Sequence, residues 1–362
     1  MCGMGLSHVI KPKAVIGTSA TNLMAWEFNE FGVPSAISYN PSCYIDHMDV
    51  HSFWDRAKNI YADILIRIFF RFTRLNVSEK LLHKKSKIIA YFQEISSHSA
   101  YVFVNAEPLI DFATPTMAKI INVGGIAVEQ PKPLSKDWNN ILSRRNNTVL
   151  ISFGTFLKSI FFNDEMKMAI VKLASALSEV TFIWKYEQDD DFSKSVMATV
   201  PNLVLAKWIP QSDLLNDDRL SLFVTHAGMG STQETARRGV PGIFVPLFGD
   251  QPRNAGMMEY NKLGKMCESR AEIFIHTSIS LIFFSYRLNA RRSAAMLAKK
   301  PFSAKEKLIK YTEFAAEFGS SPALRPQSHD MNWIEYYNVD IIFVFGLFLF
   351  VVVFGLLSIA RK

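Results

Sequence analysis

The sequence predicts an α/β protein in which a parallel sheet is flanked by helices and followed by a membrane-spanning helix. Two observations carry this prediction. Strand-like and helix-like segments alternate from residue 147 to residue 263, which is typical of a parallel sheet with helices on both faces. The run from Ile341 to Ala360 contains no charged residue, and at ~1.5 Å per residue it spans roughly 30 Å, the thickness of a bilayer core.

Length and composition indicate two domains. The chain has 362 residues, of which 49% are hydrophobic, and this is enough for two separate cores. The net charge is +7, but the basic residues are spread along the chain, so we expect a solvated basic surface and no nucleic-acid partner. Cys2, Cys43 and Cys267 are far apart and form neither a metal motif nor a disulfide framework.

The first part of the chain, to about Gly125, mixes short apolar runs with helical stretches. A buried strand is expected from Tyr101 to Asn105, after the end of a helix. Residues 129–138 carry several charges and two prolines, which predicts a linker. We therefore expect one domain over residues 1–128 and a second over residues 139–330.

The second part predicts strands and helices in turn. The helix over residues 164–179 places Met166, Ile170, Leu173 and Leu177 on one face. A later helix starts near Ser231, and another starts at Pro252 and ends before Gly264. The strands expected between them cover residues 147–154, 180–186, 202–208, 220–226 and 242–248.

The two ends of the chain differ in their targeting signals. Arg361 and Lys362 follow the apolar run directly and favour a cytosolic end. A buried core helix is the alternative for 341–360, and it is disfavoured because every face of the run is apolar. No signal peptide is visible in residues 1–13. The sequons at Asn76 and Asn146 would fit lumenal exposure, but such tripeptides also arise by chance.

The segment Leu220–Glu234 joins a strand, a histidine and a helix start. Ser231 and Glu234 have capping-box spacing, which predicts a helix beginning just after Gly230. The free amides and dipole at such an end suit a phosphate. Gly228 and Gly230 would let a ligand approach the backbone, and His226 would add a donor.

We interpret this segment as a diphosphate cradle. The alternative is an ordinary capped helix after a tight turn. A dinucleotide fingerprint would need glycine at Gln233, and a P-loop would need serine or threonine at Met266.

Two neighbouring segments strengthen the nucleotide interpretation. Trp208, at the start of the sequence WIPQ that ends at Gln211, could stack on a base, or it could simply close the edge of the core. Asp250 and Gln251 stand at a strand end and could bind sugar hydroxyls. The alternative for Asp250 is a helix cap ahead of Pro252.

Together, WIPQ, the block from Thr225 to Glu234 and the pair Asp250–Gln251 resemble the nucleotide-sugar signature of the UDP-glycosyltransferases, especially the animal UDP-glucuronosyltransferase-like enzymes of invertebrate type. The resemblance covers most of the chain. It implies a GT-B fold, with two Rossmann-like domains facing a cleft, of which the first is truncated. The first domain would bind a small lipophilic acceptor, and the second would bind the UDP-sugar, which is a co-substrate rather than a cofactor.

The resemblance also implies a role for each site residue. Trp208 would stack on uracil, and Gln211 and Glu234 would meet the ribose. The diphosphate would be held by His226, Gly228, Gly230 and Ser231. Asp250 and Gln251 would meet the donor sugar, and Ser152 and Thr155 would line the opposite wall. No metal ion is needed, because the helix N-terminus and His226 would stabilise the negative charge of the diphosphate in its place.

The sequence departs from the family pattern at several places. The histidine that deprotonates the acceptor and its partner aspartate would both lie upstream of Met1, so we assign no catalytic residue and expect the chain to be N-terminally incomplete. We interpret His8 as structural. Residues 272–292 replace a polar stretch with an apolar one, as an error in the gene model would. Ala227 replaces a usual glycine, which is a mild change only if the backbone there has a negative φ.

The functional hypothesis is a UDP-glycosyltransferase, and the alternative is a membrane-anchored UDP-sugar-binding protein without transferase activity. A Rossmann oxidoreductase is disfavoured by Gln233. We expect a single-pass protein of the endoplasmic reticulum membrane that acts in detoxification, with lumenal main domains and a cytosolic tail at 361–362. A homo-oligomer is left open. UDP should bind a region from about Trp138 to Ser320, whereas the chain as written should bind UDP-sugars poorly and transfer almost no sugar.

Overall fold

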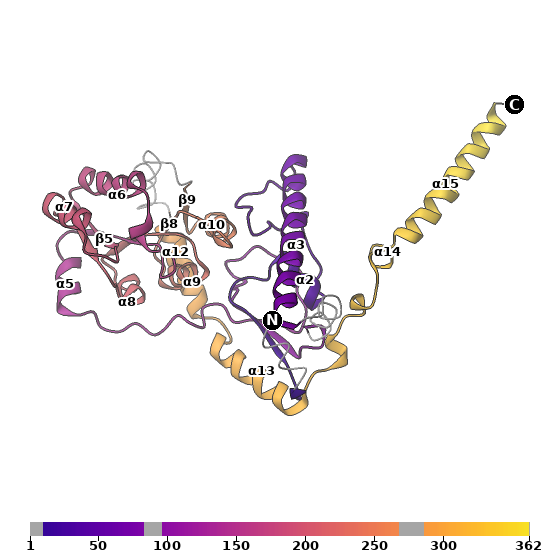
Figure 1. Cartoon of the computed structure of the whole chain (residues 1–362), viewed down its shortest axis with the longest axis horizontal. Coiled ribbons are helices and arrows are strands. Elements are labelled where there is room, and N and C mark those ends of the chain that lie inside the picture. The colour runs from indigo at the N-terminus through magenta and orange to yellow at the C-terminus, as the bar shows by residue number, and fades with distance from the viewer. Residues whose placement is uncertain (1–9, 83–95, 268–285, 362) are drawn as a thin grey trace.

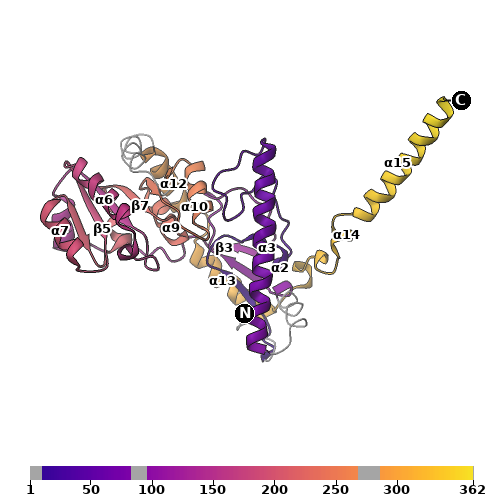
Figure 2. The same cartoon turned by 45° about the horizontal axis from the view of Figure 1, so that its top comes forward.

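The computed structural model describes residues 10–82, 96–267 and 286–361. Figures 1 and 2 show two α/β lobes side by side, with a long C-terminal helix that leaves the body of the molecule. Each lobe is built around its own parallel sheet. The two-domain α/β arrangement expected for a GT-B fold is therefore confirmed.

The C-terminal lobe contains a six-stranded sheet in the order β6-β5-β4-β7-β8-β9, with every adjacent pair parallel. Strands β5 and β7 are buried along their whole length, because helices cover both faces of the sheet. Its strands are β4 (Asn147–Ser152), β5 (Val180–Lys185), β6 (Leu203–Ala206), β7 (Leu220–Thr225), β8 (Gly242–Phe244) and β9 (Gly264–Met266).

Helices alternate with these strands as predicted. They are α5 (Lys136–Leu142), α6 (Asp164–Ala176), α7 (Asp191–Thr199), α8 (Gln211–Leu215), α9 (Met229–Arg238), α10 (Gln251–Tyr260) and α12 (Arg287–Ala298). The predicted linker is too long by three residues, because α5 already begins at Lys136. Ser135 caps that helix by accepting a hydrogen bond from the amide of Trp138 at 3.4 Å. Of the apolar segment 272–292, residues up to 285 lie outside the described part of the chain.

The N-terminal lobe contains a smaller sheet. Strands β1 (Ile16–Ser19), β2 (Tyr101–Val104) and β3 (Ile120–Asn122) pair in parallel in that order. The predicted strand from Tyr101 is thus found, one residue shorter than expected. Two helices, α2 (Ala25–Phe31) and α3 (Phe53–Leu82), pack against each other beside this sheet.

The end of the chain returns to the N-terminal lobe, which corrects the predicted second domain of 139–330. Helix α13 (Ala304–Phe318) packs on β2 and β3 and completes their core. The ring of Tyr311 lies edge-on to Tyr101 with centroids 4.8 Å apart, and Ala315 is buried. The short 3₁₀ turns Pro322–Leu324 and Gln327–His329 follow. The second domain therefore ends close to Ala298, and the chain beyond it belongs to the first.

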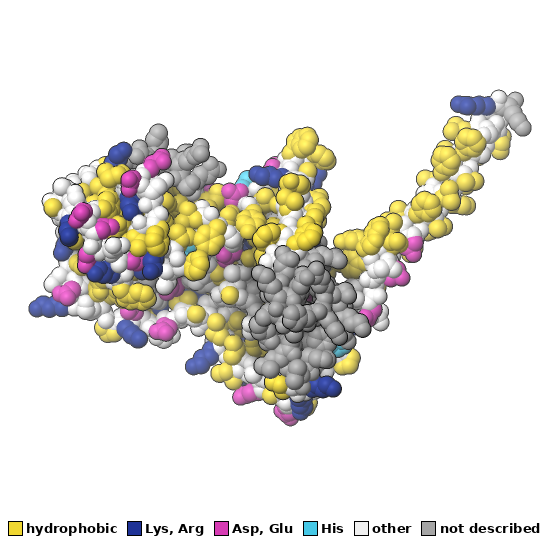
Figure 3. All heavy atoms as spheres, in the orientation of Figure 1, with side chains coloured by type: hydrophobic (Ala, Val, Ile, Leu, Met, Phe, Trp, Pro, Cys, Tyr) yellow, Lys and Arg dark blue, Asp and Glu magenta, His cyan; other side chains and the backbone are white. Residues whose placement is uncertain are grey.

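The apolar run near the C-terminus forms one exposed helix. Helix α15 (Val339–Ala360) follows the single turn α14 (Trp333–Tyr336) and is 22 residues long, with none of its most hydrophobic window buried. Figure 3 shows hydrophobic side chains over its whole visible length. The run 341–360 is thus confirmed as a helix that is long and apolar enough to cross a membrane, and it starts two residues before the predicted range.

Candidate functional site

The main cavity of the C-terminal lobe lies at the carboxyl ends of β4, β5 and β7 and reaches the other lobe at Asn105 and Gly125. Its volume is about 590 Å³, which is in the range of small-molecule sites. Nine of the eleven predicted site residues line it: Ser152, Thr155, Trp208, Gln211, His226, Gly228, Gly230, Ser231 and Glu234. We refer to this cavity as the inter-domain pocket. Strand–helix alternation brings these residues together, because parallel strands end at the same edge of the sheet.

His226 follows β7 directly and lies at the floor of the pocket. Its Nδ1 atom is 3.3 Å from the hydroxyl of Thr225. Burial of the imidazole, together with the nearby Lys185 ammonium, lowers the pKa of His226 to about 4. The ring is therefore neutral at neutral pH and acts through a single N–H donor, not through a positive charge.

Two glycines make room for the His226 ring. A Cβ at Gly228 would lie 2.5 Å from His226 Nε2, and a Cβ at Gly154 would lie 2.8 Å from His226 Cε1. The expectation that Gly228 clears space for a ligand is therefore corrected, since the histidine ring occupies that space. Gly230 differs, because a Cβ there would meet no atom within 4 Å. The side chain missing at Gly230 leaves the pocket itself open.

Helix α9 begins two residues earlier than predicted. Its first residue is Met229 and its N-cap is Gly228, which makes no side-chain cap hydrogen bond. The predicted capping box of Ser231 and Glu234 is thus wrong, because both residues lie inside the helix. The N-terminus of α9 is still suited to binding an anion, because the first amides of a helix have no intrahelical partner and no side chain caps this turn.

Ala227 has a left-handed backbone in the turn that leads into α9. Its φ is +63° and its side chain is fully buried. The substitution of a usual glycine would be mild only with a negative φ, so that expectation is wrong. Alanine in this region costs about 1–2 kcal/mol. The turn stores strain directly beside His226.

Lys185, at the end of β5, is a pocket residue that the sequence prediction missed. Its ammonium donates to the carbonyl of Gly154 at 2.6 Å and lies 5.4 Å from the centre of the Trp208 ring. Lys185 is only 6% exposed, so solvent screens its charge little. The sequence offers only a charged residue at the end of an otherwise apolar strand. Its place in the pocket depends on the pairing of β5 with β4, whose end is followed by Gly154.

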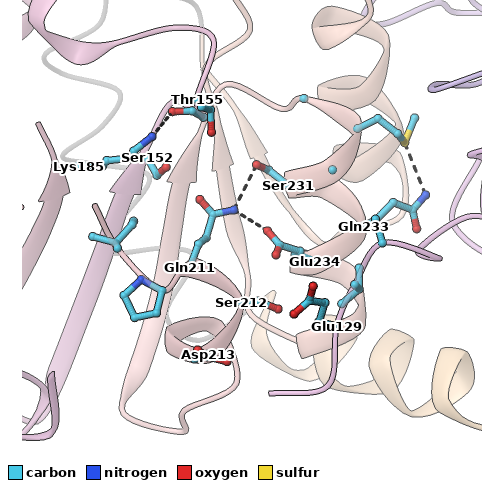
Figure 4. Close-up of a pocket in the computed structure, with 18 of the residues that line it drawn as sticks. Glu129, Ser152, Thr155, Lys185, Gln211, Ser212, Asp213, Ser231, Gln233 and Glu234 are labelled. Atoms are coloured by element: carbon cyan, nitrogen blue, oxygen red, sulfur yellow. Dashed lines mark hydrogen bonds between the residues drawn. The ribbon is translucent and has the colours of Figure 1, made fainter. Parts of the chain in front are cut away.

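A hydrogen-bonded group connects α8 with α9 (Figure 4). The amide of Gln211 donates to the carboxylate of Glu234 and, at 3.4 Å, to the hydroxyl of Ser231. Burial raises the pKa of Glu234, while hydrogen bonds from Gln211 and Ser212 act in the opposite direction. The carboxylate is therefore held in one orientation at the wall of the pocket and can accept from a ligand hydroxyl.

Trp208 lies at the rim of the pocket between β6 and α8. Its side chain is 70% exposed, so it does not close the core edge as the alternative proposed. One side of the indole faces the Lys185 ammonium. The exposed area of the ring is available for a planar ligand group.

Asp250 and Gln251 do not line the pocket, which corrects their predicted place. Gln251 is buried, and its side-chain oxygen Oε1 accepts hydrogen bonds from the backbone amides of Leu247 and Phe248 at 2.8 and 3.0 Å. Asp250 occupies the N-cap position of α10 without a side-chain cap bond, and it accepts a hydrogen bond from Asn254 at 2.7 Å. The Gln251 side chain stabilises the loop before α10, whereas the Asp250 side chain bonds to the first turns of the helix itself.

A buried carboxylate connects the two lobes on the far side of α9. Glu107 follows β2, has no exposed side-chain surface, and pairs with Lys300 at 2.6 Å and with Arg237 at 3.4 Å. Arg237 also donates to the carbonyl of Gly124 at 2.6 Å. Since Arg237 belongs to α9, the helix whose N-terminus faces the pocket is fixed at its other end to the N-terminal lobe.

The described residues contain no cluster of metal ligands. Over residues 10–82, 96–267 and 286–361, no three His, Cys, Asp or Glu side chains are placed to hold a metal ion. His47 and His51 are exposed before α3, and neither lines the inter-domain pocket. His8 lies outside the described residues. The pocket can thus bind an aromatic ring, hydroxyls and an anion.

The chain is similar to known proteins over its whole length. A family model described as UDP-glucoronosyl and UDP-glucosyl transferase matches residues 1–362. UDP-glucuronosyltransferase 1A8 of Homo sapiens is 29% identical over 85% of this chain and 58% of its own length. UDP-glucuronosyltransferase 3A1 of Bos taurus is 28% identical over 92% of this chain and 64% of its own length.

Two further similarities complete the comparison. UDP-glycosyltransferase UGT4 of Dactylopius coccus is 26% identical over 87% of this chain and 63% of its own length. A solved structure of LpCGTa in complex with UDP is 18% identical, with a TM-score of 0.46 over 66% of this chain and 58% of that chain. The chain thus spans less than two thirds of the length of the curated relatives it matches.

Proposed function

Because the chain belongs to the UDP-glucuronosyl and UDP-glucosyl transferase family, we propose that its inter-domain pocket binds the UDP part of a UDP-sugar. One observation carries the proposal. An exposed indole, a fixed carboxylate, an uncapped helix N-terminus and a buried lysine all face one cavity of about 590 Å³. These groups match the base, ribose and diphosphate of UDP in chemistry.

Each group has a proposed role. Trp208 stacks on the uracil ring, and Glu234 accepts hydrogen bonds from the ribose while Gln211 holds its carboxylate. The diphosphate binds the first amides of α9, with Ser231 and the neutral His226 as additional donors. Ser152 and Thr155 form the opposite wall, and the Gly230 backbone allows a close approach.

Lys185 takes the role that the sequence interpretation gave to His226. His226 is neutral, so the cation near the diphosphate is Lys185, which is positioned by the carbonyl of Gly154 and by the carboxylate of Glu187 at 3.9 Å. Together with the helix dipole, this charge supports binding without a metal ion. We therefore propose that UDP binding is independent of divalent cations.

The proposed reaction is transfer of the sugar to a small lipophilic acceptor held by the N-terminal lobe. The alternative is a membrane-anchored protein that binds UDP-sugars without transferring them. From the apolar helix α15 and the basic residues Arg361 and Lys362 that follow it, we also propose residence in the endoplasmic reticulum membrane with lumenal lobes, and a role in detoxification.

The binding proposal is tested by calorimetric titration of the full chain with UDP, with and without EDTA. His226→Ala should weaken binding by roughly 1.5–3 kcal/mol, or about 10- to 150-fold, because a charge-assisted hydrogen bond is lost. Lys207→Ala is the matched control, since this exposed lysine pairs with Asp189 outside the pocket. Equal UDP affinity of wild type and the His226 variant would remove His226 from the site.

Gly230→Ala separates binding from stability. Alanine is favoured over glycine inside a helix by about 1 kcal/mol, and the added methyl meets no protein atom. The variant should be at least as stable as wild type and yet bind UDP less tightly. Unchanged UDP affinity would show that the ligand does not approach this position.

A transfer assay distinguishes the enzyme from the binding protein. The chain is incubated with several UDP-sugars and a simple phenol, in parallel with a form that carries any upstream sequence found in the transcript. Transfer only by the longer form supports an upstream general base, whose contribution is typically ~10²–10⁴-fold. Transfer by neither form, with intact UDP binding, supports the binding protein.

A further inference from the structure

Two exposed phenylalanine rings meet at the mouth of the inter-domain pocket. Phe156, in the loop after β4, lines the pocket and is 91% exposed. Its ring lies edge-on to that of Phe248, in the loop after β8, with the ring centres 6.3 Å apart. Isolated exposed apolar side chains are ordinary, but these two come from loops that are distant in the sequence and contact each other. We refer to Phe156 and Phe248 as the aromatic pair.

The order of the strands shows where the aromatic pair lies. Strand β7 lies between β4 and β8 in the sheet, so a contact between Phe156 and Phe248 spans the end of β7, which is followed by His226 and the start of α9. Trp208 follows β6, which lies on the other side of β4. The aromatic pair therefore borders the pocket on the side of β8, away from Trp208.

Both rings stand on loops whose backbone is held in place. The side-chain oxygen of Gln251 accepts hydrogen bonds from the backbone amides of Leu247 and Phe248. On the other loop, the carbonyl of Gly154 accepts a hydrogen bond from the Lys185 ammonium. A ligand that packs on the aromatic pair therefore loses little free energy in ordering these loops.

The sugar is the part of a UDP-sugar that would reach this side of the pocket. This step rests on the proposed UDP site, with the uracil at Trp208 and the diphosphate at the start of α9. The sugar is attached to the second phosphate, so it continues away from the uracil, towards β8. Asp250 and Gln251 do not line the pocket there, whereas Phe156 does. A pyranose ring can pack its C–H face on a phenyl ring, because both surfaces are apolar.

The charges of the pocket are placed away from the aromatic pair. Among the described residues that line the pocket, the cationic side chains are Lys132 and Lys185. The amide of Lys132 donates to Asp213 of α8, and the Lys185 ammonium lies against the Trp208 ring, so both lie on the side of the base and phosphates. The face of a phenyl ring is negative. An ionised carboxylate on the sugar would therefore lose its water at the aromatic pair without gaining a partner.

We propose that the aromatic pair packs against the sugar of the donor and selects an uncharged hexose over a hexuronic acid. Phe156 contacts the sugar, and Phe248 positions the Phe156 ring. The inference deepens the proposed function, because it names the class of donor that the UDP site accepts.

Calorimetric titrations of the full chain with UDP, UDP-glucose and UDP-glucuronate test this selection. UDP-glucose should bind about three- to tenfold more tightly than UDP, because the sugar adds an apolar contact. UDP-glucuronate should bind at least about tenfold less tightly than UDP-glucose, because its carboxylate is left unpaired. Equal affinity for the two donors would overturn the proposed selection.

Variants of the aromatic pair assign the effect to its rings. Phe156→Ala should abolish the gain of UDP-glucose over UDP and leave the affinity for UDP unchanged, and folding is not at risk because the ring is exposed. Phe161→Ala is the matched control, since this ring is 78% exposed in the next turn and does not line the pocket. Phe248→Ala should reduce the same gain, and the double variant should lose no more than Phe156→Ala alone, because Phe248 acts through Phe156.

A reversal of the charge preference is the sharpest expected result. Phe156→Arg should bind UDP-glucuronate more tightly than UDP-glucose, because a guanidinium pairs with a carboxylate. An unchanged gain in Phe156→Ala, or an equal loss of affinity for UDP and UDP-glucose, would overturn the inference while the UDP site stands. Absence of UDP binding by the wild-type chain would overturn the proposed function and this inference together.

Discussion

The two lobes build their parallel sheets in different ways. The C-terminal sheet has six strands, and its helices come from the chain between consecutive strands. The N-terminal sheet has three strands, and part of its core comes from α13, which follows β3 only after the whole C-terminal lobe. The core of the C-terminal lobe is formed by segments that are adjacent in the sequence, whereas the core of the N-terminal lobe requires a helix that is distant in the sequence.

This difference explains where the ligand pocket is located. Most of its wall comes from the C-terminal lobe. The other side contributes Asn105, Gly125, Ala127 and Val128, followed by Glu129 and Lys132 of the linker. The pocket residues are fixed by contacts within one lobe, such as Lys185 to Gly154 and Gln211 to Glu234. We therefore expect damage to the N-terminal sheet to leave the UDP site largely intact. Four experiments test this separation, from the largest expected effect to the smallest.

The largest effect is expected from a charge in the core shared by α13 and β2. Ala315→Glu places a carboxylate at a site that is 1% exposed, which should cost the N-terminal lobe more than about 4 kcal/mol. Hydrogen exchange should then lose protection at β2 and β3 while β4 and β5 keep theirs. Ala316→Glu, on the exposed side of the same helix, is the control. Equal loss of protection in both sheets would show that the lobes fold as one unit.

The next largest effect concerns the contact between the lobes. Glu107→Gln removes the carboxylate that pairs with Lys300 and Arg237, and breaking a buried pair costs about 3–5 kcal/mol. Thermal unfolding should separate into two transitions. Glu306→Gln, which breaks the exposed pair with Lys310, should change stability by less than about 1 kcal/mol. A single transition in the Glu107 variant would contradict the proposed coupling.

Acid should destabilise both lobes through one histidine in each. Burial lowers the pKa of His226 and of His329 to about 4, below the ordinary 6.5. The unfolded chain therefore takes up these protons first, and the free energy of unfolding falls as the pH drops from about 6.5 towards 4. For His226, a pKa lowered from 6.5 to about 4 corresponds to a loss of roughly 3 kcal/mol.

Single variants assign this pH dependence to each lobe. Hydrogen exchange at several pH values measures how the stability of each sheet changes with pH. His226→Gln should reduce this change for β4 and β7, and His329→Gln should reduce it for β2 and β3. If the protection of the matching sheet depends on pH in the variant as it does in wild type, that histidine does not cause the acid destabilisation of its lobe.

The smallest expected effect is a gain in the stability of the C-terminal lobe. Ala227→Gly relieves the left-handed alanine and should raise the stability of the C-terminal lobe by about 1 kcal/mol or less, since a buried methyl is lost at the same time. Lys262→Gly is the matched comparison, because Lys262 also has a positive φ of 55° but loses no fully buried side chain. A loss of stability in the Ala227 variant would mean that packing of the methyl outweighs the strain.

The sequence was sufficient for features set by local pattern. Alternating apolar runs predicted the strands from β4 to β8, and polar residues at strand ends predicted most of the pocket. Lys185 was missed because a lysine at the end of a strand has no distinguishing local pattern. Its role depends on β5, β4 and β7 lying side by side in the sheet.

The errors have physical causes. Ser231 and Glu234 fit a capping box by spacing, but Gly228 is the N-cap of α9, so Ser231 is already the third residue of the helix. Asp250 and Gln251 follow a strand end, yet the amides of the preceding loop compete for the Gln251 side chain. The partner of α13 could not be predicted, because its contacts with β2 and β3 have no local signature. The sign of φ at Ala227 likewise depends on the fold around it.

The position of α13 has a consequence for the order of folding during synthesis. The strand β3 ends at Asn122 and Ala315 is made far later, so at 5–20 residues per second the N-terminal sheet waits on the order of 10–40 s for its last helix. All strands of the C-terminal sheet, which ends with β9 at Met266, and the helix α12 are made in that interval. The lobe encoded second can therefore be finished first, and the lobe encoded first remains exposed to chaperones and proteases until the ribosome has nearly reached the anchor.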